Sequence, residues 1–273
     1  MSFRPFMYWQ EVSGNWFLVP ERPRAIIHFL GGAFVAAAPH LTYRWLLEAL
    51  YQEGYAVIAT PFVNTFDHGA IAHETLITFE QGLTYLGKQR PELQDLPIYG
   101  LGHSMGCKVH LLIGSIHSAR RAGNMFVSFN NYPARKSIPL LDQALQQARQ
   151  FVPDLQLDTR MEFVPSPEQT LDLIGTQYET PYNLLVKFRS DTIDQTRPLS
   201  DVLVRRFPQT TTVKIIQGSH TTPIAQDVQW QTSSSFSPFD AIGQFVKQEF
   251  YRDIKVLKAE ILYWLEGERP IYG

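Results

Sequence analysis

The sequence predicts an α/β protein with a mostly parallel, doubly wound sheet, and two features support this prediction. Short apolar runs at residues 25–30, 55–60 and 184–188 are typical of buried strands. Amphipathic stretches at residues 41–50 and 67–90, with apolar residues at helical spacing, separate the earlier runs. Strands that alternate with helices in this way are joined by right-handed crossovers, so the sheet they form is parallel.

Length and composition limit the kind of protein and partner. The chain has 273 residues, which suits one α/β domain with a large core. Charged residues make up 18% and the net charge is −2, which argues against nucleic acid or an anionic membrane surface as partner. We expect a small-molecule or acyl substrate, mostly neutral. The composition leaves the oligomeric state open.

Cysteine content and hydropathy bear on the location of the protein. Cys107 is the single cysteine, so no internal disulfide can form, as is usual in a reducing compartment. No stretch reaches the length of a transmembrane segment, and the first residues show no charged head followed by an apolar run. The sequence therefore predicts a soluble protein.

The first quarter of the chain begins with an edge hairpin. Residues 7–20 alternate aromatic and polar groups around a Ser-Gly-Asn turn, which predicts two antiparallel strands. The strand at 25–30 ends in Gly31-Gly32, where the backbone can approach a ligand closely or simply leave the strand in a tight turn. Pro91 ends the helix over 67–90.

Residues 96–106 form the most informative stretch. Apolar residues up to Leu101 predict a strand that runs directly into a helix through Gly102-His103-Ser104-Met105-Gly106. A serine at such a turn has a strained backbone, and glycines on both sides remove side chains that would collide. The following helix supplies free N–H groups beside the hydroxyl. This arrangement is typical of a nucleophile.

The alternation of strands and helices breaks between residues 132 and 180. After a strand at 125–129, a helical stripe covers 140–148, and Ser166 precedes a proline and a glutamine in a capping pattern. We expect residues 1–131 and 181–273 to form the core and 132–180 to be inserted as a helical lid. The alternative is that these helices cover a face of the sheet.

The last third of the chain resumes the alternation. After the strand at 184–188 we expect a helix near 198–207, a strand at 212–217 and a turn at 218–220. A polar loop over 226–238 precedes a long final helix. Its apolar positions are Ile242, Val246, Phe250, Leu257, Ile261 and Trp264.

Ser104, His220 and an aspartate form the candidate catalytic group. A serine hydroxyl needs a base to remove its proton, and the base needs a third group to hold its tautomer. His220 follows the last expected strand, and Asp191 follows the strand before it. Asp194 can reach the same imidazole, so it stays the alternative acid; otherwise it caps the next helix.

For the oxyanion hole we expect the backbone N–H groups of Met105 and of Ala33, with Phe34 as the substitute.

Other chemistry-bearing residues give weaker signals. His68 and His73 are five positions apart, so they point to different helix faces, and we expect both on the surface. The side chain of His103 is expected to point away from the Ser104 hydroxyl, and Cys107 is expected to fill a gap. Because no metal-ligand set, phosphate loop or nucleotide motif occurs, we expect neither a metal nor a cofactor.

Three segments resemble a known superfamily, the α/β hydrolases. They are His28 to Phe34, Gly102 to Lys108 and Phe188 to Asp194. More narrowly, the chain resembles a family of cyanobacterial and plant chloroplast proteins catalogued as a domain of unknown function. The resemblance implies the α/β-hydrolase fold, and a location in the cytoplasm or, for plant relatives, the chloroplast. Many superfamily members carry His-Gly where this chain has Gly31-Gly32. The chain therefore departs from the superfamily pattern in the segment that is expected to supply the first oxyanion donor.

The resemblance also implies a reaction. Ser104 is the implied nucleophile, His220 the base, and Asp191 or Asp194 its partner, in ester or thioester cleavage through an acyl-enzyme. Apolar residues of the insertion, namely Leu141, Leu145, Phe163 and Leu171, favour a hydrophobic substrate. Two alternatives stay open: an acyltransferase that uses the same site, and a non-catalytic binding protein with the same fold.

Overall fold

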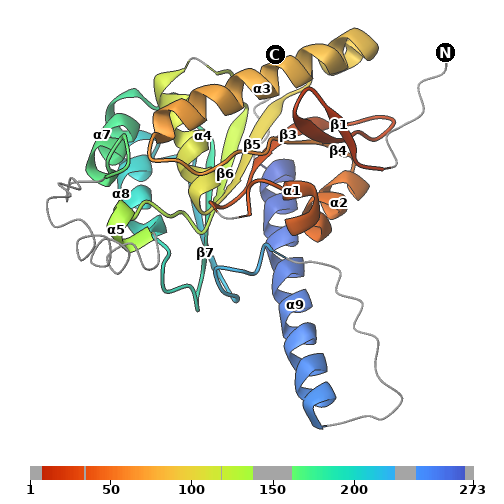
Figure 1. Ribbon diagram of the computed structural model, residues 1–273, viewed down its shortest axis with the longest axis vertical. Coiled ribbons are helices and arrows are strands. Elements are labelled where there is room, and N and C mark those ends of the chain that lie inside the picture. Colours follow the sequence, from red (N-terminus) through yellow and green to blue (C-terminus); the bar gives the residue numbers. More distant parts are fainter. Residues whose placement is uncertain (1–7, 34, 118, 138–161, 225–237, 268–273) are drawn as a thin grey trace, which may run out of the picture.

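The computed structural model describes residues 8–33, 35–117, 119–137, 162–224 and 238–267, with the backbone alone for residues 135, 137 and 238–250. Within them, eight strands form one sheet in the order β1-β2-β4-β3-β5-β6-β7-β8 (Figure 1). The strands are β1 (Gln10–Val12), β2 (Asn15–Leu18), β3 (Ala25–Leu30), β4 (Tyr55–Ala59), β5 (Ile98–His103), β6 (Gly123–Val127), β7 (Asn183–Phe188) and β8 (Thr211–Ile216). The described helices are α1 (Pro39–Thr42), α2 (Arg44–Gln52), α3 (His68–Gln89), α4 (Met105–Ile116), α5 (Ala134–Ser137), α7 (Pro167–Gln177), α8 (Thr196–Arg206) and α9 (Pro238–Gly267), with a 3₁₀ turn at Pro91–Leu93.

The direction of the strands confirms the predicted fold class. Strands β1 and β2 pair as an antiparallel hairpin, and β2 is antiparallel to β4. All further pairs, from β4 through β3 to β8, are parallel. The turn of the hairpin has positive φ angles at both Ser13 (50°) and Gly14 (73°), which a two-residue turn of this kind requires.

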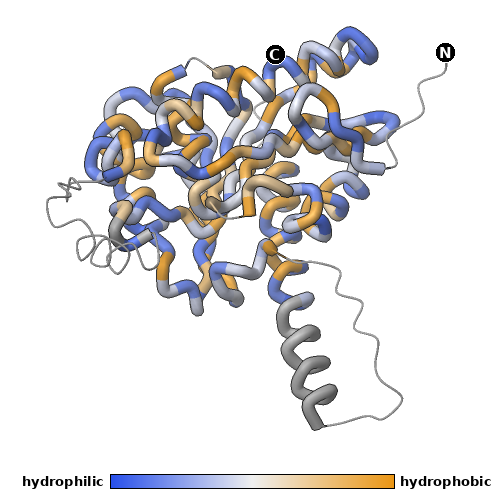
Figure 2. Tube along the Cα trace, in the orientation of Figure 1, coloured by the Kyte–Doolittle hydropathy of each residue, from blue (hydrophilic) through white to orange (hydrophobic). Residues whose placement is uncertain are grey.

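Helices cover both faces of the sheet. Alternate residues of the strands, such as Ile27 and Phe29 of β3, pack with α2 and the C-terminal part of α9. The opposite face packs against α3, α4, α7 and α8, as shown by Ile26 with Phe79 and by Phe126 with Tyr178. Figure 2 shows hydrophobic residues gathered along the central strands. The sheet is therefore the middle layer of three, as strands buried on both sides require.

The turn between β5 and α4 is tightly packed. Ser104 has a φ of 54°, in a region that residues with side chains rarely adopt. A Cβ atom on Gly102 would lie 2.6 Å from the backbone nitrogen of Cys107. One on Gly106 would overlap the carbonyl oxygen of Leu30 and lie 2.7 Å from that of Gly31. Both glycines are therefore needed for the helix to start directly above β3.

Three elements differ in their bounds from the sequence prediction. The strand expected at 125–129 is β6 at Gly123–Val127, because Ser128 has a φ of 52° and ends the extended backbone. The helix expected at 41–50 is divided into α1 and α2 at Tyr43, whose φ of −114° interrupts the helical backbone. The helix expected near 198–207 begins two residues earlier, at Thr196.

Parts of the expected insertion and final helix lie outside the described residues. The stripe at 140–148 and the polar loop at 226–237 belong to those parts. The capping box at Ser166 is present, and the helix it starts, α7, packs against α4 and α8. In α9, Leu257, Ile261 and Trp264 are buried as expected, whereas the side chains of Ile242, Val246 and Phe250 are not described. Within the described residues, no helix combines the length and apolar character needed to cross a membrane.

We predict that Gly106→Ala destabilises the fold. The added methyl group meets backbone oxygens that cannot move independently of β3, so we expect a loss of about 1–3 kcal/mol in the free energy of unfolding. Gly175→Ala in α7 is the matched control. Its added Cβ lies 3.6 Å from Val202, an ordinary contact, so this variant should gain about 0.5–1 kcal/mol from helix propensity. Urea unfolding followed by circular dichroism measures both, and equal stabilities of Gly106→Ala and the wild type would contradict the packing argument.

Candidate active site

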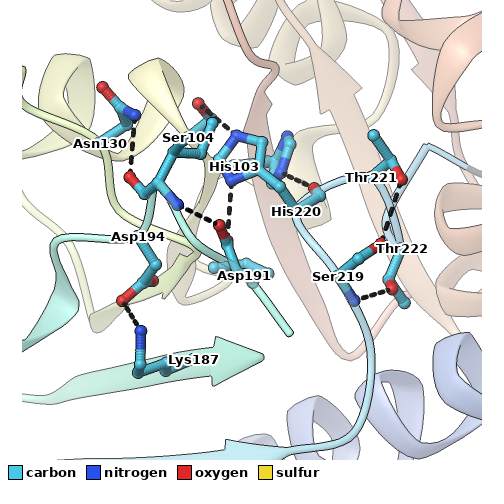
Figure 3. A network of polar contacts seen from close by, with 12 residues as sticks. His103, Ser104, Asn130, Lys187, Asp191, Asp194, Ser219, His220, Thr221 and Thr222 are labelled. Atoms are coloured by element: carbon cyan, nitrogen blue, oxygen red, sulfur yellow. Dashed lines mark hydrogen bonds and ion pairs between the residues drawn. The ribbon is translucent and has the colours of Figure 1, made fainter. Parts of the chain in front are cut away.

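Three side chains from the ends of three strands meet in one hydrogen-bonded row (Figure 3). Ser104 follows β5, Asp191 follows β7 and His220 follows β8. The Oγ atom of Ser104 lies 3.0 Å from Nε2 of His220, and Nδ1 of His220 lies 2.8 Å from Oδ2 of Asp191. These residues are 116 and 29 positions apart in the sequence. The parallel strands bring them together because their carboxyl ends share one edge of the sheet.

The charge of Asp191 determines the tautomer of His220. Burial by itself raises the pKa of this carboxyl group, but hydrogen bonding from His220 and from the backbone N–H of Ile193 outweighs it and holds the pKa below its usual value. Asp191 is therefore ionised at neutral pH and can only accept hydrogen bonds. Nδ1 of His220 carries the proton that it donates to Asp191, which leaves Nε2 free to accept the proton of Ser104.

Asp194, the alternative acid, has other partners. Its Oδ1 atom lies 2.8 Å from Nζ of Lys187 and accepts the backbone N–H of Thr196 at 3.0 Å. Its Oδ2 atom accepts the Thr196 hydroxyl group at 2.7 Å. Figure 3 shows Asp194 turned toward Lys187, away from His220. The structure thus brings Asp191, and not Asp194, to the imidazole, while Asp194 holds the first turn of α8.

A second hydrogen-bonded row supports the loops of the site. The backbone N–H of Gly32 donates to the Tyr43 hydroxyl at 2.8 Å, and this hydroxyl lies 2.8 Å from Nδ1 of His103. Nε2 of His103 lies 2.9 Å from the carbonyl oxygen of His220, which can only accept. Nε2 of His103 therefore carries the proton, and Nδ1 accepts from Tyr43. The row ties the loop after β3 to the loop that carries His220.

The expected oxyanion donors lie around Ser104. Ala33 and Met105 both line the cavity that contains the Ser104 hydroxyl. A Cβ atom on Gly32 would lie 3.3 Å from that of Ser104, so the glycine permits this close approach. Because the N–H of Gly32 already donates to Tyr43, the next donors along the loop are Ala33 and Phe34. Phe34 lies outside the described residues.

A cavity of about 640 Å³ opens over the Ser104 hydroxyl. It is lined by apolar side chains together with a group of polar ones, a composition common in small-molecule sites. The lining residues are Gly32, Ala33, Val35, Asn64, His68, His103, Ser104, Met105, Lys108, Asn130, Asn131, Tyr132, Lys136, Phe163, Ile193, His220 and Ile224. Of the apolar insertion residues expected near the substrate, Phe163 lines this cavity. Leu171 packs in the core beside α8 instead, and Leu141 and Leu145 lie outside the described residues.

One pocket residue, His68, differs from the sequence expectation, and two others, Lys108 and Tyr43, were not predicted. His68, expected on the surface, is 3% exposed and lines the cavity, because it begins α3 where that helix faces Phe163. Lys108 is 1% exposed and also lines the cavity. The sequence held a signal for this placement, because a residue four positions after Ser104 lies on the same face of α4. The role of Tyr43 had no signal in the sequence, since it depends on contacts across the sheet.

The thiol of Cys107 is buried beneath the turn at Ser104. Cys107 is fully buried, donates to the carbonyl oxygen of Gly102 at 3.1 Å and fills space beneath the turn, as expected. Burial raises the pKa of its thiol well above the ordinary value, so the thiol is not reactive. Among the described residues, no group of three histidine, cysteine or carboxylate side chains is placed to hold a metal ion.

The sheet order, the turn at Ser104 and the helices on both faces define the fold of the α/β hydrolases. Within that class, the chain belongs to the family described as protein of unknown function DUF1350, whose model matches residues 8–267. Among curated proteins there is no match to this chain.

Solved structures with the same fold include proteins of different kinds. The TT1662 protein of Thermus thermophilus aligns with a TM-score of 0.51 at 15% identity, covering 96% of this chain and 99% of that one. The S-formylglutathione hydrolase FrmB of Staphylococcus aureus aligns with a TM-score of 0.50 at 14% identity, covering 88% and 89%. Acylaminoacyl peptidase of Pyrococcus horikoshii aligns with a TM-score of 0.50 at 16% identity, covering 76% and 35%. At such identities the likeness shows a shared fold.

We predict that the buried imidazole of His103 makes stability depend on pH. Burial lowers the pKa of His103 to about 3 in the folded protein, from an ordinary value of 6.5. Below pH 6.5 the unfolded chain therefore binds a proton that the folded chain excludes. The part of the free energy of unfolding that comes from His103 is fully present above that pH. Below it, this part falls by about 1 kcal/mol per pH unit as the pH decreases.

The variant His103→Gln removes this contribution, so its free energy of unfolding should fall less steeply than that of the wild type between pH 6.5 and pH 5. Urea titrations at several pH values measure the slope, which does not depend on the absolute stability of the variant. The control is His73→Gln, because His73 is exposed in α3. Equal slopes for the wild type and His103→Gln would contradict the neutral, buried state assigned to His103.

Proposed function

We propose that the protein is a serine hydrolase that cleaves a carboxylic ester or thioester. The observation that carries the proposal is the hydrogen-bonded row of Ser104, His220 and Asp191, with distances of 3.0 and 2.8 Å. Such distances are those of a nucleophile and base that work as a pair. The cavity over Ser104 and the fold shared with S-formylglutathione hydrolase give further support.

In the proposed first half-reaction, Oγ of Ser104 attacks the carbonyl carbon of the substrate while its proton passes to Nε2 of His220. Asp191 stabilises the imidazolium that results. The backbone N–H groups of Met105 and Ala33 donate to the carbonyl oxygen as it becomes negative. His220 then gives the proton to the leaving alcohol or thiol, and the acyl group stays on Ser104 as an ester.

In the second half-reaction, His220 takes a proton from a water molecule, whose oxygen attacks the acyl carbon. The carboxylic acid leaves, and Ser104 regains its proton from His220. Transfer of the acyl group to an alcohol or amine would use the same residues, but no observation in the site favours such an acceptor. A Ser104–His220 separation beyond about 5 Å would favour the non-catalytic alternative, and the observed 3.0 Å gives it no such support.

The expected location in the cytoplasm, or in the chloroplast for plant relatives, remains part of the proposal. The single buried Cys107 fits a reducing compartment.

The proposal predicts that Ser104 reacts covalently with a fluorophosphonate probe. Labelling of the wild-type protein should be complete, and Ser104→Ala should abolish it while circular dichroism shows an unchanged fold. Labelling that persists in Ser104→Ala would reject the assigned nucleophile.

The rate of the same labelling distinguishes the two aspartates. Asp191→Asn should slow it strongly, about 10³-fold or more, because the amide cannot hold His220 in the tautomer that accepts from Ser104. Asp194→Asn should have the smaller effect, since its partners are Lys187 and Thr196. Slower labelling of Asp194→Asn than of Asp191→Asn would instead identify Asp194 as the partner of His220.

A further inference from the structure

The cavity over Ser104 contains a buried amine that the proposed hydrolysis does not use. Lys108 lies one turn after Ser104 on α4, and its Nζ atom donates to the carbonyl oxygen of Pro165 at 3.1 Å. An ammonium group has three N–H donors. Among the described residues, this carbonyl is the one hydrogen-bond partner found for Nζ. Lys108 therefore has donors left over inside the cavity that it lines.

The carboxylates of the described residues do not neutralise this amine at close range. Among the described residues, none lies within 4.0 Å of Nζ of Lys108. Glu162 and Glu168 attract it from further away, but Glu162 accepts the N–H groups of Ala134 and Phe163 at 2.9 and 2.8 Å. Glu168 accepts the hydroxyl group of a neighbouring serine at 3.1 Å. Burial lowers the pKa of Lys108 to about 7 in spite of both glutamates, as expected of a cation without an adjacent counter-ion.

His68 adds unused hydrogen-bonding capacity beside Lys108. Its ring is 3% exposed and lines the same cavity, and neither ring nitrogen has a hydrogen-bond partner within the part of the chain that the structure describes. The imidazole stacks on Phe163 with ring centroids 4.1 Å apart, and Nζ of Lys108 lies 5.6 Å from the centroid of the same Phe163 ring. Buried polar groups are nearly always paired. His68 and Lys108 thus place two groups with unused hydrogen-bonding capacity, among the described residues, on one side of the cavity.

We propose that Lys108 and His68 bind a negatively charged group of the substrate. The inference rests on the proposed hydrolase function and narrows the substrate to esters or thioesters that also carry an anion, such as a carboxylate. Residues four apart on a helix are separated by about 6 Å along its axis, so one small molecule can reach both Ser104 and Lys108. Apolar lining residues, including Phe163 and Ile193, suit the carbon chain between the two polar ends.

The anion can belong to the acyl part or to the leaving group, and two pairs of synthetic substrates distinguish these sources. The first pair is 4-nitrophenyl hydrogen adipate and 4-nitrophenyl hexanoate, which differ by a terminal carboxylate on acyl chains of equal carbon number. The second pair is the hexanoyl thioesters of 3-mercaptopropionate and of its methyl ester. In at least one pair, the wild-type enzyme should show a kcat/KM about tenfold or more higher for the anionic member.

Lys108→Met should reduce that preference to about one, while Lys108→Arg, which keeps the charge, should retain part of it. Lys88→Met removes an exposed lysine of α3 and is the matched control that keeps the full preference. Two outcomes would overturn the proposal: no preference for the anion in either pair, or a preference that survives in Lys108→Met. A preference lost only in Lys136→Met would assign the anion to the exposed lysine at the cavity wall instead.

A binding measurement makes the test independent of turnover. Monomethyl adipate should bind to Ser104→Ala about tenfold or more tightly than methyl hexanoate does, measured by calorimetry, and adding Lys108→Met should remove the difference. If neither substrate pair is cleaved but this difference is present, the hydrolase proposal fails and the anion site stands. If the esters are cleaved and the difference is absent, the anion site fails and the hydrolase proposal stands.

Discussion

The arrangement of the site depends on one backbone constraint, the strained turn that joins β5 to α4. Ser104 has a φ of 54°, and Gly102 and Gly106 leave no space for a side chain where the helix passes over β3. The surrounding parallel strands hold the turn in place, since β5 lies between β3 and β6. A serine held in this way projects its hydroxyl above the edge of the sheet. Because its backbone is already fixed, it loses little further conformational entropy when a substrate binds.

Hydrogen bonds extend this constraint to the other loops of the site. The row from Gly32 through Tyr43 and His103 ends on the carbonyl oxygen of His220, next to the side chain that contacts Ser104. The loops after β3 and β8 are therefore fixed to the end of β5 by side chains that themselves do not touch Ser104 Oγ. Such support keeps the imidazole of His220 within hydrogen-bonding distance of Ser104.

Most of the fold could be predicted from the sequence, because its signals are local. Apolar runs and capping residues located β3, β4, α3 and α7 to within a few residues, and chain order alone associated Ser104 with His220 and an aspartate. The sequence left the acid undecided, since Asp191 and Asp194 lie on the same loop and only packing turns Asp194 toward Lys187. The prediction that His68 lies on the surface was wrong, since its ring stacks on Phe163, which is distant in the sequence.

In the proposed reaction, Ser104 carries the acyl group from the first half-reaction to the second. Brief incubation with 4-nitrophenyl hexanoate, an acid quench and mass spectrometry of the digested protein test this directly. We expect a hexanoyl group on the peptide that contains Ser104, formed together with a burst of nitrophenol of about one equivalent. Hydrolysis of the ester with an acyl group on another residue would contradict it.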